Sequence, residues 1–197
     1  MEYSTIKITA LEAEKILFEL YNIKGKASSL PGYVDFNFRI KIENEEGYIL
    51  KISRPEENKK YLDYQQKLLQ FIHQSDEKII APKILFDQND EAVSEIIDDY
   101  GNKRYVRMLT WVSGRVWSSV NPQLEGFRFS LGEQCGILTK ALQSFDHPEA
   151  HYYFDWDIAQ SLWTKKHLHL FDEQKKEVLR YFQDLFEASQ VSYKKLR

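Results

Sequence analysis

Hydrophobic and polar residues alternate strictly over residues 35–42, and this is the clearest strand pattern in the chain. Residues 43–47 then have the composition of a turn, and a second strand pattern follows over residues 48–53. The two runs predict an antiparallel hairpin that places Lys51 near the middle of a sheet. Three further strand-like runs occupy residues 83–86, 92–97 and 104–112.

Helical spacing of apolar residues marks the segments around these strands. Thr9 and Glu12 have the spacing of a capping box at the start of an amphipathic helix. A second helix, with Pro55 in its first turn, is predicted to run to about Gln74 and to pack on the sheet. Residues 24–32, rich in Gly and Ser, are predicted to be a loop.

The pattern changes at Ser113-Gly114, because every later segment reads as helix or loop. The helical segments are residues 130–145, a weaker stretch at 157–170, and a last helix that Asp172 can cap. We therefore predict an α+β fold. Residues 1–112 form a lobe with five antiparallel strands, an inserted helix and an N-terminal helix, and residues 113–197 form a partial helical lobe.

The composition excludes several classes of function. A chain of 197 residues with 43% hydrophobic residues can bury a core. The net charge is −3, and basic residues are mixed with acidic ones, so we expect no nucleic-acid partner. The sequence has neither a long apolar run nor a signal-peptide pattern, which predicts a cytoplasmic protein without a membrane partner. Cys135 occupies an apolar helical position and is predicted to be a buried structural thiol.

Lys51 is the sharpest departure from these patterns, because it interrupts the apolar strand Tyr48-Ile-Leu-Lys-Ile52. A buried ammonium group needs an anionic partner or a route to water. One interpretation is a lysine that reaches solvent from an edge strand. The other is a lysine that holds the phosphates of a nucleotide, which a long-stemmed cation can do without forming a covalent bond.

The order of the predicted elements and five stretches of sequence carry a family resemblance. A loop with small residues, a hairpin whose second strand holds the lysine, a helix, further strands and then helices follow one another as in nucleotide-binding lobes of the protein-kinase kind. The chain resembles the aminoglycoside phosphotransferase and choline kinase family, especially its hydroxylysine kinase and homoserine kinase branch, which includes kinase-like regions fused in front of class III aminotransferases. The stretches are Leu30–Arg39, Tyr48–Ser53, Val106–Gly114, Leu131–Gly132 with Leu142–Pro148, and Phe154–Asp157.

The resemblance implies a protein-kinase-like N-lobe and a set of nucleotide-binding residues. By this likeness Lys51 would hold the phosphates, the loop at residues 31–37 would fold over them, and the backbone of residues 109–112 would be the hinge that binds adenine. Gln65 would face Lys51, where the kinase fold usually has a glutamate. The loop and hinge residues singled out are Gly32, Tyr33, Asn37, Leu109, Thr110 and Val112.

The sequence departs from the family pattern at the catalytic loop. Phosphoryl transfer needs a carboxylate for the attacking hydroxyl and oxygen ligands for Mg²⁺, and the family supplies them from a His-x-Asp loop. None of the five histidines is followed two residues later by Asp. Asp155 precedes the family's metal position, Asp157 reads as a helix N-cap, and His167 with His169 reads as surface or packing. We therefore expect no catalytic residue and no metal ligand, and a fragment that ends before the catalytic loop and is inactive alone.

Three functional hypotheses remain open. The first is a fragment of a phosphotransferase that uses ATP or GTP with Mg²⁺ and acts on the hydroxyl of a small amino-containing metabolite; its partners would be nucleotide, substrate and the rest of the parent chain. The second is a non-catalytic regulatory or docking domain of a larger protein, with PLP involved only if an aminotransferase domain follows. The third is an interaction domain unrelated to kinases, in which Lys51 would be exposed.

Overall fold

A computed structural model describes residues 7–193 apart from residues 34, 56, 76–77 and 155, and without the side chains of residues 191 and 193. Contacts divide the chain into two compact units, residues 1–150 and residues 151–197. The boundary between lobes at residues 112 and 113 stays a prediction.

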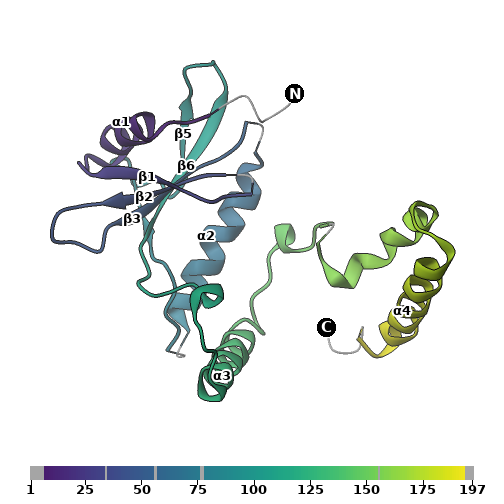
Figure 1. The fold of residues 1–197 in the computed structure, drawn as a ribbon. Helices are drawn as coiled ribbons and strands as arrows, with labels where there is room; N and C mark the ends of the chain where they lie inside the picture. The colour runs from purple at the N-terminus through teal and green to yellow at the C-terminus, as the bar shows by residue number, and fades with distance from the viewer. Residues whose placement is uncertain (1–6, 34, 56, 76–77, 155, 194–197) are drawn as a thin grey trace. The chain divides into compact units, whose positions relative to one another are not determined.

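The first unit is built on a six-stranded antiparallel sheet (Figure 1). The strands follow the order β1-β2-β3-β6-β4, and β5 also pairs with β6. The predicted α+β class is confirmed, with five of the strands near their expected positions. The strands are β1 (Lys26–Leu30), β2 (Phe36–Lys41), β3 (Tyr48–Ile52), β4 (Ile84–Leu85), β5 (Ser94–Ile97) and β6 (Lys103–Thr110).

Strand β1 corrects the prediction of a loop at residues 24–32 and of only five strands. Its sequence, Lys-Ala-Ser-Ser-Leu, has little intrinsic preference for a strand. All five of its residues nevertheless pair with β2, from Lys26 opposite Lys41 to Leu30 opposite Asn37. Backbone pairing with a well-formed neighbour therefore outweighs the local composition.

Helix α1 (Ala10–Tyr21) covers one face of the sheet, and its predicted capping box is confirmed. The Thr9 hydroxyl accepts a hydrogen bond from the Glu12 amide at 3.2 Å, and the Glu12 carboxylate accepts one from the Thr9 amide at 2.5 Å. The buried side of the helix presents Ala13, Leu17 and Tyr21 to the sheet. They join the main core with Phe38, Ile40, Leu50, Ile52, Val106 and Met108.

Tyr21 should make the stability of this core depend on pH above 10. Burial raises the pKa of Tyr21 to about 12, because the phenolate loses its hydration inside the protein. The unfolded chain releases this proton near pH 10, so its stabilising effect is complete below pH 10 and is lost as the pH rises through 12. Between pH 9 and 11.5 we expect the wild type to lose about 2 kcal/mol more unfolding free energy than Tyr21→Phe. Urea unfolding of both proteins measures this difference, and parallel pH profiles would contradict the prediction.

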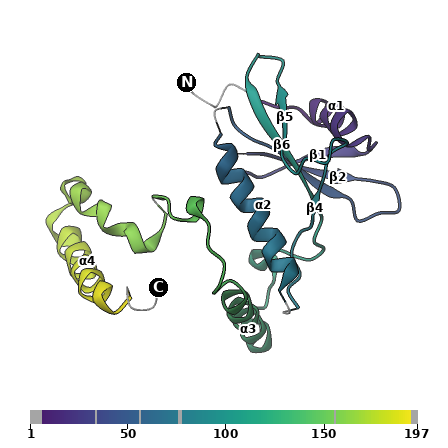
Figure 2. The ribbon, with the colours of Figure 1, turned by 180° about the vertical axis from the view of Figure 1, so that it is seen from behind.

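Helix α2 (Lys59–Gln74) packs on the opposite face of the sheet from α1 (Figures 1 and 2). It begins later than predicted, because the Asn58 side chain accepts a hydrogen bond from the Lys60 amide at 3.0 Å and caps the helix. Pro55 therefore lies in the preceding loop and not in the first helical turn. The buried residue Leu62 forms a second apolar cluster with Tyr61, Val93 and Tyr105.

The described elements that follow β6 are all helical, as the sequence predicts beyond Ser113. They begin with a 3-10 turn, η2 (Trp117–Ser119), continue with helix α3 (Glu125–Ala141), and reach η3 (Pro148–Ala150) at the end of the first unit. Aromatic rings join this segment to α2. Phe145 lies 5.1 Å from Phe71 and 6.1 Å from Tyr64, measured between ring centroids.

The prediction that Cys135 is buried was wrong, because its side chain is exposed on α3. The apolar spacing of this helix is real, but none of its residues is buried in the structure. Periodicity identifies the face of a helix that is suited to packing, whereas burial also requires a neighbouring element.

The second unit contains η4 (Ile158–Leu170) and helix α4 (Glu173–Tyr193). Asp157 caps η4 as predicted, accepting a hydrogen bond from the Ala159 amide at 2.9 Å. Asp172 likewise accepts a hydrogen bond from the Lys175 amide at 2.9 Å at the start of α4. Both aspartates have the capping roles that the sequence indicates.

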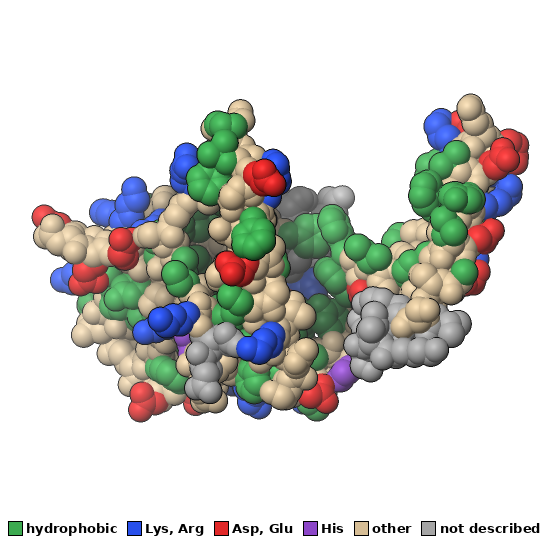
Figure 3. Space-filling model, turned by 90° about the horizontal axis from the view of Figure 1, so that it is seen from below, with side chains coloured by type: hydrophobic (Ala, Val, Ile, Leu, Met, Phe, Trp, Pro, Cys, Tyr) green, Lys and Arg blue, Asp and Glu red, His purple; other side chains and the backbone are tan. Residues whose placement is uncertain are grey.

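Surface charge and hydropathy agree with the composition. On the face in Figure 3, basic and acidic side chains are interspersed among apolar ones and do not gather into a patch of one sign. Among the described residues, no helix is both long enough and apolar enough to cross a membrane.

Candidate functional site

A polar row crosses the α2-facing side of the sheet and contains Lys51. Antiparallel register places Asn37 of β2 opposite Lys51 of β3, and Lys51 opposite Arg107 of β6. Since successive side chains of a strand point to opposite faces, the apolar neighbours Leu50 and Met108 face the α1 core. The local pattern thus separates an apolar face from a polar one on the same three strands.

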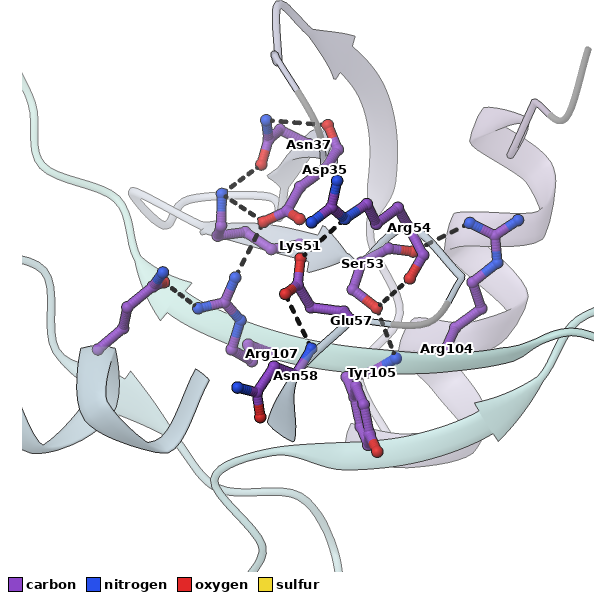
Figure 4. Close-up of polar contacts among 11 residues, drawn as sticks. Asp35, Asn37, Lys51, Ser53, Arg54, Glu57, Asn58, Arg104, Tyr105 and Arg107 are labelled. Carbon is purple, nitrogen blue, oxygen red and sulfur yellow. Dashed lines mark hydrogen bonds and ion pairs between the residues drawn. The ribbon is translucent and has the colours of Figure 1, made fainter. Parts of the chain in front are cut away.

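Lys51 lies on an interior strand, and its amino group has two polar contacts (Figure 4). The Nζ atom donates to Asn37 Oδ1 at 2.6 Å and forms an ion pair with Asp35 Oδ2 at 3.2 Å. Its side chain is 24% exposed. Because a lysine ammonium has three N–H groups, these contacts with described residues leave one for an anionic ligand.

Gly32 allows the loop before β2 to fold tightly beside these residues. A Cβ atom at Gly32 would lie 2.4 Å from the Asp35 carbonyl oxygen and 2.5 Å from Asn37 Nδ2. Any side chain here would have to displace backbone or the amide that contacts Lys51. The adjacent Tyr33 is exposed. The predicted loop over the site therefore contains one glycine whose lack of a side chain the packing requires.

Gln65 does not orient Lys51 in the way the sequence analysis expects. Its Oε1 atom accepts a hydrogen bond from Arg107 Nη1. The carboxylate partner of Lys51 is instead Asp35, which precedes β2, and Asp35 Oδ2 also accepts from Arg107 Nη2 at 2.9 Å. The helix therefore reaches Lys51 only indirectly, through Arg107 and Asp35.

Asp35 and Arg107 are the site residues that the sequence analysis missed. Arg107 interrupts the apolar run Tyr105-Val-Arg-Met-Leu109, just as Lys51 interrupts its own strand, and this signal was available. Burial lowers the pKa of the Arg107 guanidinium, while the nearby Asp35 carboxylate opposes that shift. Arginine nevertheless keeps its charge at any physiological pH.

In the predicted hinge at residues 109–112, two backbone amides donate hydrogen bonds to other parts of the protein. The Thr110 amide donates to the Lys83 carbonyl at 2.8 Å, and the Trp111 amide donates to the Gly47 carbonyl at 3.2 Å. Trp111 also stacks against the Arg39 guanidinium, 3.7 Å from the ring centroid. The two Trp111 contacts join this segment to the β2–β3 hairpin, and the Thr110 contact joins it to Lys83, just before β4.

Around Lys51 the described residues present a positively charged group, and they form no cluster of metal ligands. The Asp35 carboxylate is occupied by two cations, and within the described part of the chain no three His, Cys, Asp or Glu side chains gather closely enough to bind a metal. Asp157 is a helix cap, while Asp155 lies outside the described residues. An ammonium group held in this way is suited to bind an anion.

Comparison with known proteins gives a family and two related folds. The family model described as "Phosphotransferase enzyme family" matches residues 26–192. The structure is similar to amicoumacin kinase hAmiN, solved in complex with AMP-PNP, Ca²⁺ and Ami, with a TM-score of 0.62 and 18% identity over 90% of this chain and 52% of that one. It is also similar to a microcompartment-associated aminopropanol kinase, with a TM-score of 0.57 and 17% identity over 75% and 45% of the two chains.

These likenesses concern the fold, and they bear out the predicted kinase-like arrangement of sheet and helices. The chain spans about half the length of the two solved kinases. A search of curated protein sequences gave no match.

Proposed function

Because the chain belongs to the phosphotransferase enzyme family, we propose that it is the nucleotide-binding part of a small-molecule kinase. The full reaction would move the γ-phosphoryl group of ATP or GTP, with Mg²⁺, onto a hydroxyl of a small amino-containing metabolite. Lys51 is the observation that supports this proposal most. Its ammonium group lies mid-sheet, held by Asn37 and Asp35, with one N–H left among its described contacts for a phosphate oxygen.

The other predicted site residues have complementary roles in this proposal. The loop containing Gly32 and Tyr33 would cover the phosphates, and Asn37 would aim the lysine. The amides of Thr110 and Trp111 already donate within the protein. We therefore assign the adenine contact to the carbonyl groups of the hinge and to the backbone of Val112.

The second hypothesis, a non-catalytic regulatory or docking domain, has less support than the nucleotide-binding part of a kinase. The sequence arguments for it were a neutral Gln65 in place of a helical glutamate and a loop before the strand with a single glycine, Gly32. Asp35 supplies Lys51 with a carboxylate from another element, so the missing glutamate no longer argues against phosphate binding. The comparisons lend no support to an aminotransferase or to PLP, and neither is part of the proposal.

Titration of Mg-ATP against the wild type and Lys51→Met tests the proposal. We expect the substitution to weaken binding about tenfold or more, because it removes the cation that faces the phosphates. Lys41→Met is the matched control, since Lys41 is an exposed lysine on the neighbouring strand β2 and should leave the affinity unchanged. Binding is the appropriate measurement because the sequence has no His-x-Asp pattern. Equal affinities of the wild type and Lys51→Met would refute the role of the lysine.

A further inference from the structure

Arg107 shares the carboxylate that holds Lys51. The two residues are direct cross-strand partners on β6 and β3, and both approach Asp35 Oδ2, at 2.9 Å for Arg107 Nη2 and 3.2 Å for Lys51 Nζ (Figure 4). One negative charge is therefore divided between two positive charges. The arrangement differs from a simple pair of one lysine and one carboxylate.

The charge balance of this cluster favours an anionic ligand. In a simple pair, the carboxylate would cancel most of the field of the lysine at the place where a phosphate would bind. Here Lys51, Arg107 and Asp35 sum to a charge of about +1 when their ordinary ionisation states are counted. The charge of Glu57 also acts on Arg107, but Glu57 is paired with Arg54 at 3.4 Å, and these two charges cancel. Without Arg107, Asp35 would neutralise Lys51. With Arg107 present, the three groups together keep a net positive charge.

Arg107 cannot itself be the group that reaches the ligand. Its side chain is 4% exposed, whereas that of Lys51 is 24% exposed. The second arm of its guanidinium, Nη1, donates to Gln65 of α2, so the planar group is fixed between a helix and the loop before β2. Its effect on a ligand must therefore pass through Asp35 and Lys51.

We propose that Arg107 is a positioning residue for nucleotide phosphates. It partly neutralises the Asp35 carboxylate, so that the positive charge of Lys51 remains available to an anion. The contact with Gln65 ties this function to helix α2, in place of a direct pair between the helix and the lysine. The inference rests on the proposed function, because it assumes that Lys51 meets the phosphates. It adds a prediction that Lys51 alone does not make, namely that phosphate affinity follows the net charge of the cluster.

Four proteins test this charge rule by titration with Mg-ATP and with inorganic tripolyphosphate at low ionic strength. They are the wild type, Arg107→Met, Asp35→Asn and the double variant. Their cluster charges are about +1, 0, +2 and +1, given ordinary ionisation states. We expect Arg107→Met to bind about tenfold more weakly than the wild type. Asp35→Asn should bind more tightly, and the double variant should recover most of the affinity that Arg107→Met loses.

Recovery in the double variant distinguishes positioning from a merely structural role. If Arg107 only supported the fold, removing Asp35 as well would leave binding as weak as in Arg107→Met or weaker. Lys103→Met is the matched control, because it removes one positive charge from the exposed end of the same strand, and it should leave affinity unchanged. Circular dichroism establishes that each variant is folded. If Arg107→Met does not fold, Asp35→Asn decides alone, and affinity equal to or below that of the wild type overturns the inference.

The same experiment separates the inference from the proposed function. For this purpose the Lys51→Met variant is titrated alongside the four proteins. If the wild type binds no more tightly than Lys51→Met, the proposed function itself is wrong. If the wild type binds through Lys51 and Arg107→Met binds equally well, only the role of Arg107 is wrong. Tripolyphosphate lacks adenine, so a matching order of affinities for both probes assigns the effect to the phosphates.

Discussion

Replacing Asp98 with alanine should lower the free energy of unfolding by about 3–5 kcal/mol, because it leaves a buried arginine without its anionic partner. The Arg104 side chain is 0% exposed and that of Asp98 is 3% exposed. Arg104 Nε donates to Asp98 Oδ2 at 2.7 Å, and Nη1 donates to the Ser53 carbonyl at 3.0 Å. The pair joins the β5–β6 turn to the end of β3, one residue beyond the strand that carries Lys51.

A surface pair on the same hairpin provides the control. Glu95 and Lys103 lie 2.8 Å apart with side chains 43% and 52% exposed, so Glu95→Ala should leave the stability unchanged within error. Urea unfolding of both variants measures the contrast. The buried-pair argument predicts that Arg104→Met combined with Asp98→Ala is less destabilised than Asp98→Ala alone. An Asp98→Ala protein as stable as Glu95→Ala would contradict it.

Asp98 should also make the stability of the protein depend on pH in the acid range. Burial would by itself raise the pKa of Asp98, but hydrogen bonds from the Asn102 backbone and the Arg104 side chain outweigh it, and the pKa is lowered. A lowered pKa contributes stability that is present above the ordinary aspartate value and is lost as the pH falls through the folded value. As the pH is lowered below 4, the free energy of unfolding should therefore fall further for the wild type than for Asp98→Asn. Urea unfolding of both proteins at a series of pH values measures this difference.

Much of the site could be predicted because short-range patterns determine it. Strict alternation over residues 35–42 and a turn ending at Gly47 fix the hairpin register, and that register places Asn37 opposite Lys51. Period-two alternation also fixes which face of the sheet carries the lysine. The interior position of Lys51 also requires β6 to pair with the other edge of β3, and these local patterns do not determine that pairing.

The residues that surround Lys51 could not be predicted from local sequence patterns. Arg107 is 56 residues further along the chain, and its pairing with Lys51 depends on β6 being the neighbour of β3, which the alternation of residues does not determine. Asp35 is the first residue of the predicted strand at 35–42, directly after a loop, so its carboxylate could equally have served local backbone groups. Gln65 has the expected position on α2, and only three-dimensional placement assigns it to Arg107.

Gly47→Ala should destabilise the first unit by about 3 kcal/mol, because it combines an unfavourable backbone conformation with a steric clash. Gly47 has φ of +73°, which side-chain-bearing residues rarely adopt. A Cβ atom there would lie 2.1 Å from the Ile40 carbonyl oxygen, closer than any van der Waals contact. The hairpin must shift to accommodate it, and the Gly47 carbonyl that accepts from the Trp111 amide must shift as well.

Gly101→Ala measures the penalty of the backbone conformation without a clash. Gly101 has φ of +79°, but no atom lies within 4 Å of the place where its Cβ would be. It should therefore cost only about 1 kcal/mol, the penalty of the left-handed conformation. Because Gly47 immediately precedes β3, its substitution should also weaken Mg-ATP binding by disturbing the register of Lys51, whereas Gly101→Ala should bind normally. Equal losses of stability in the two variants, measured by urea unfolding, would mean that the hairpin accommodates the methyl group without moving the lysine.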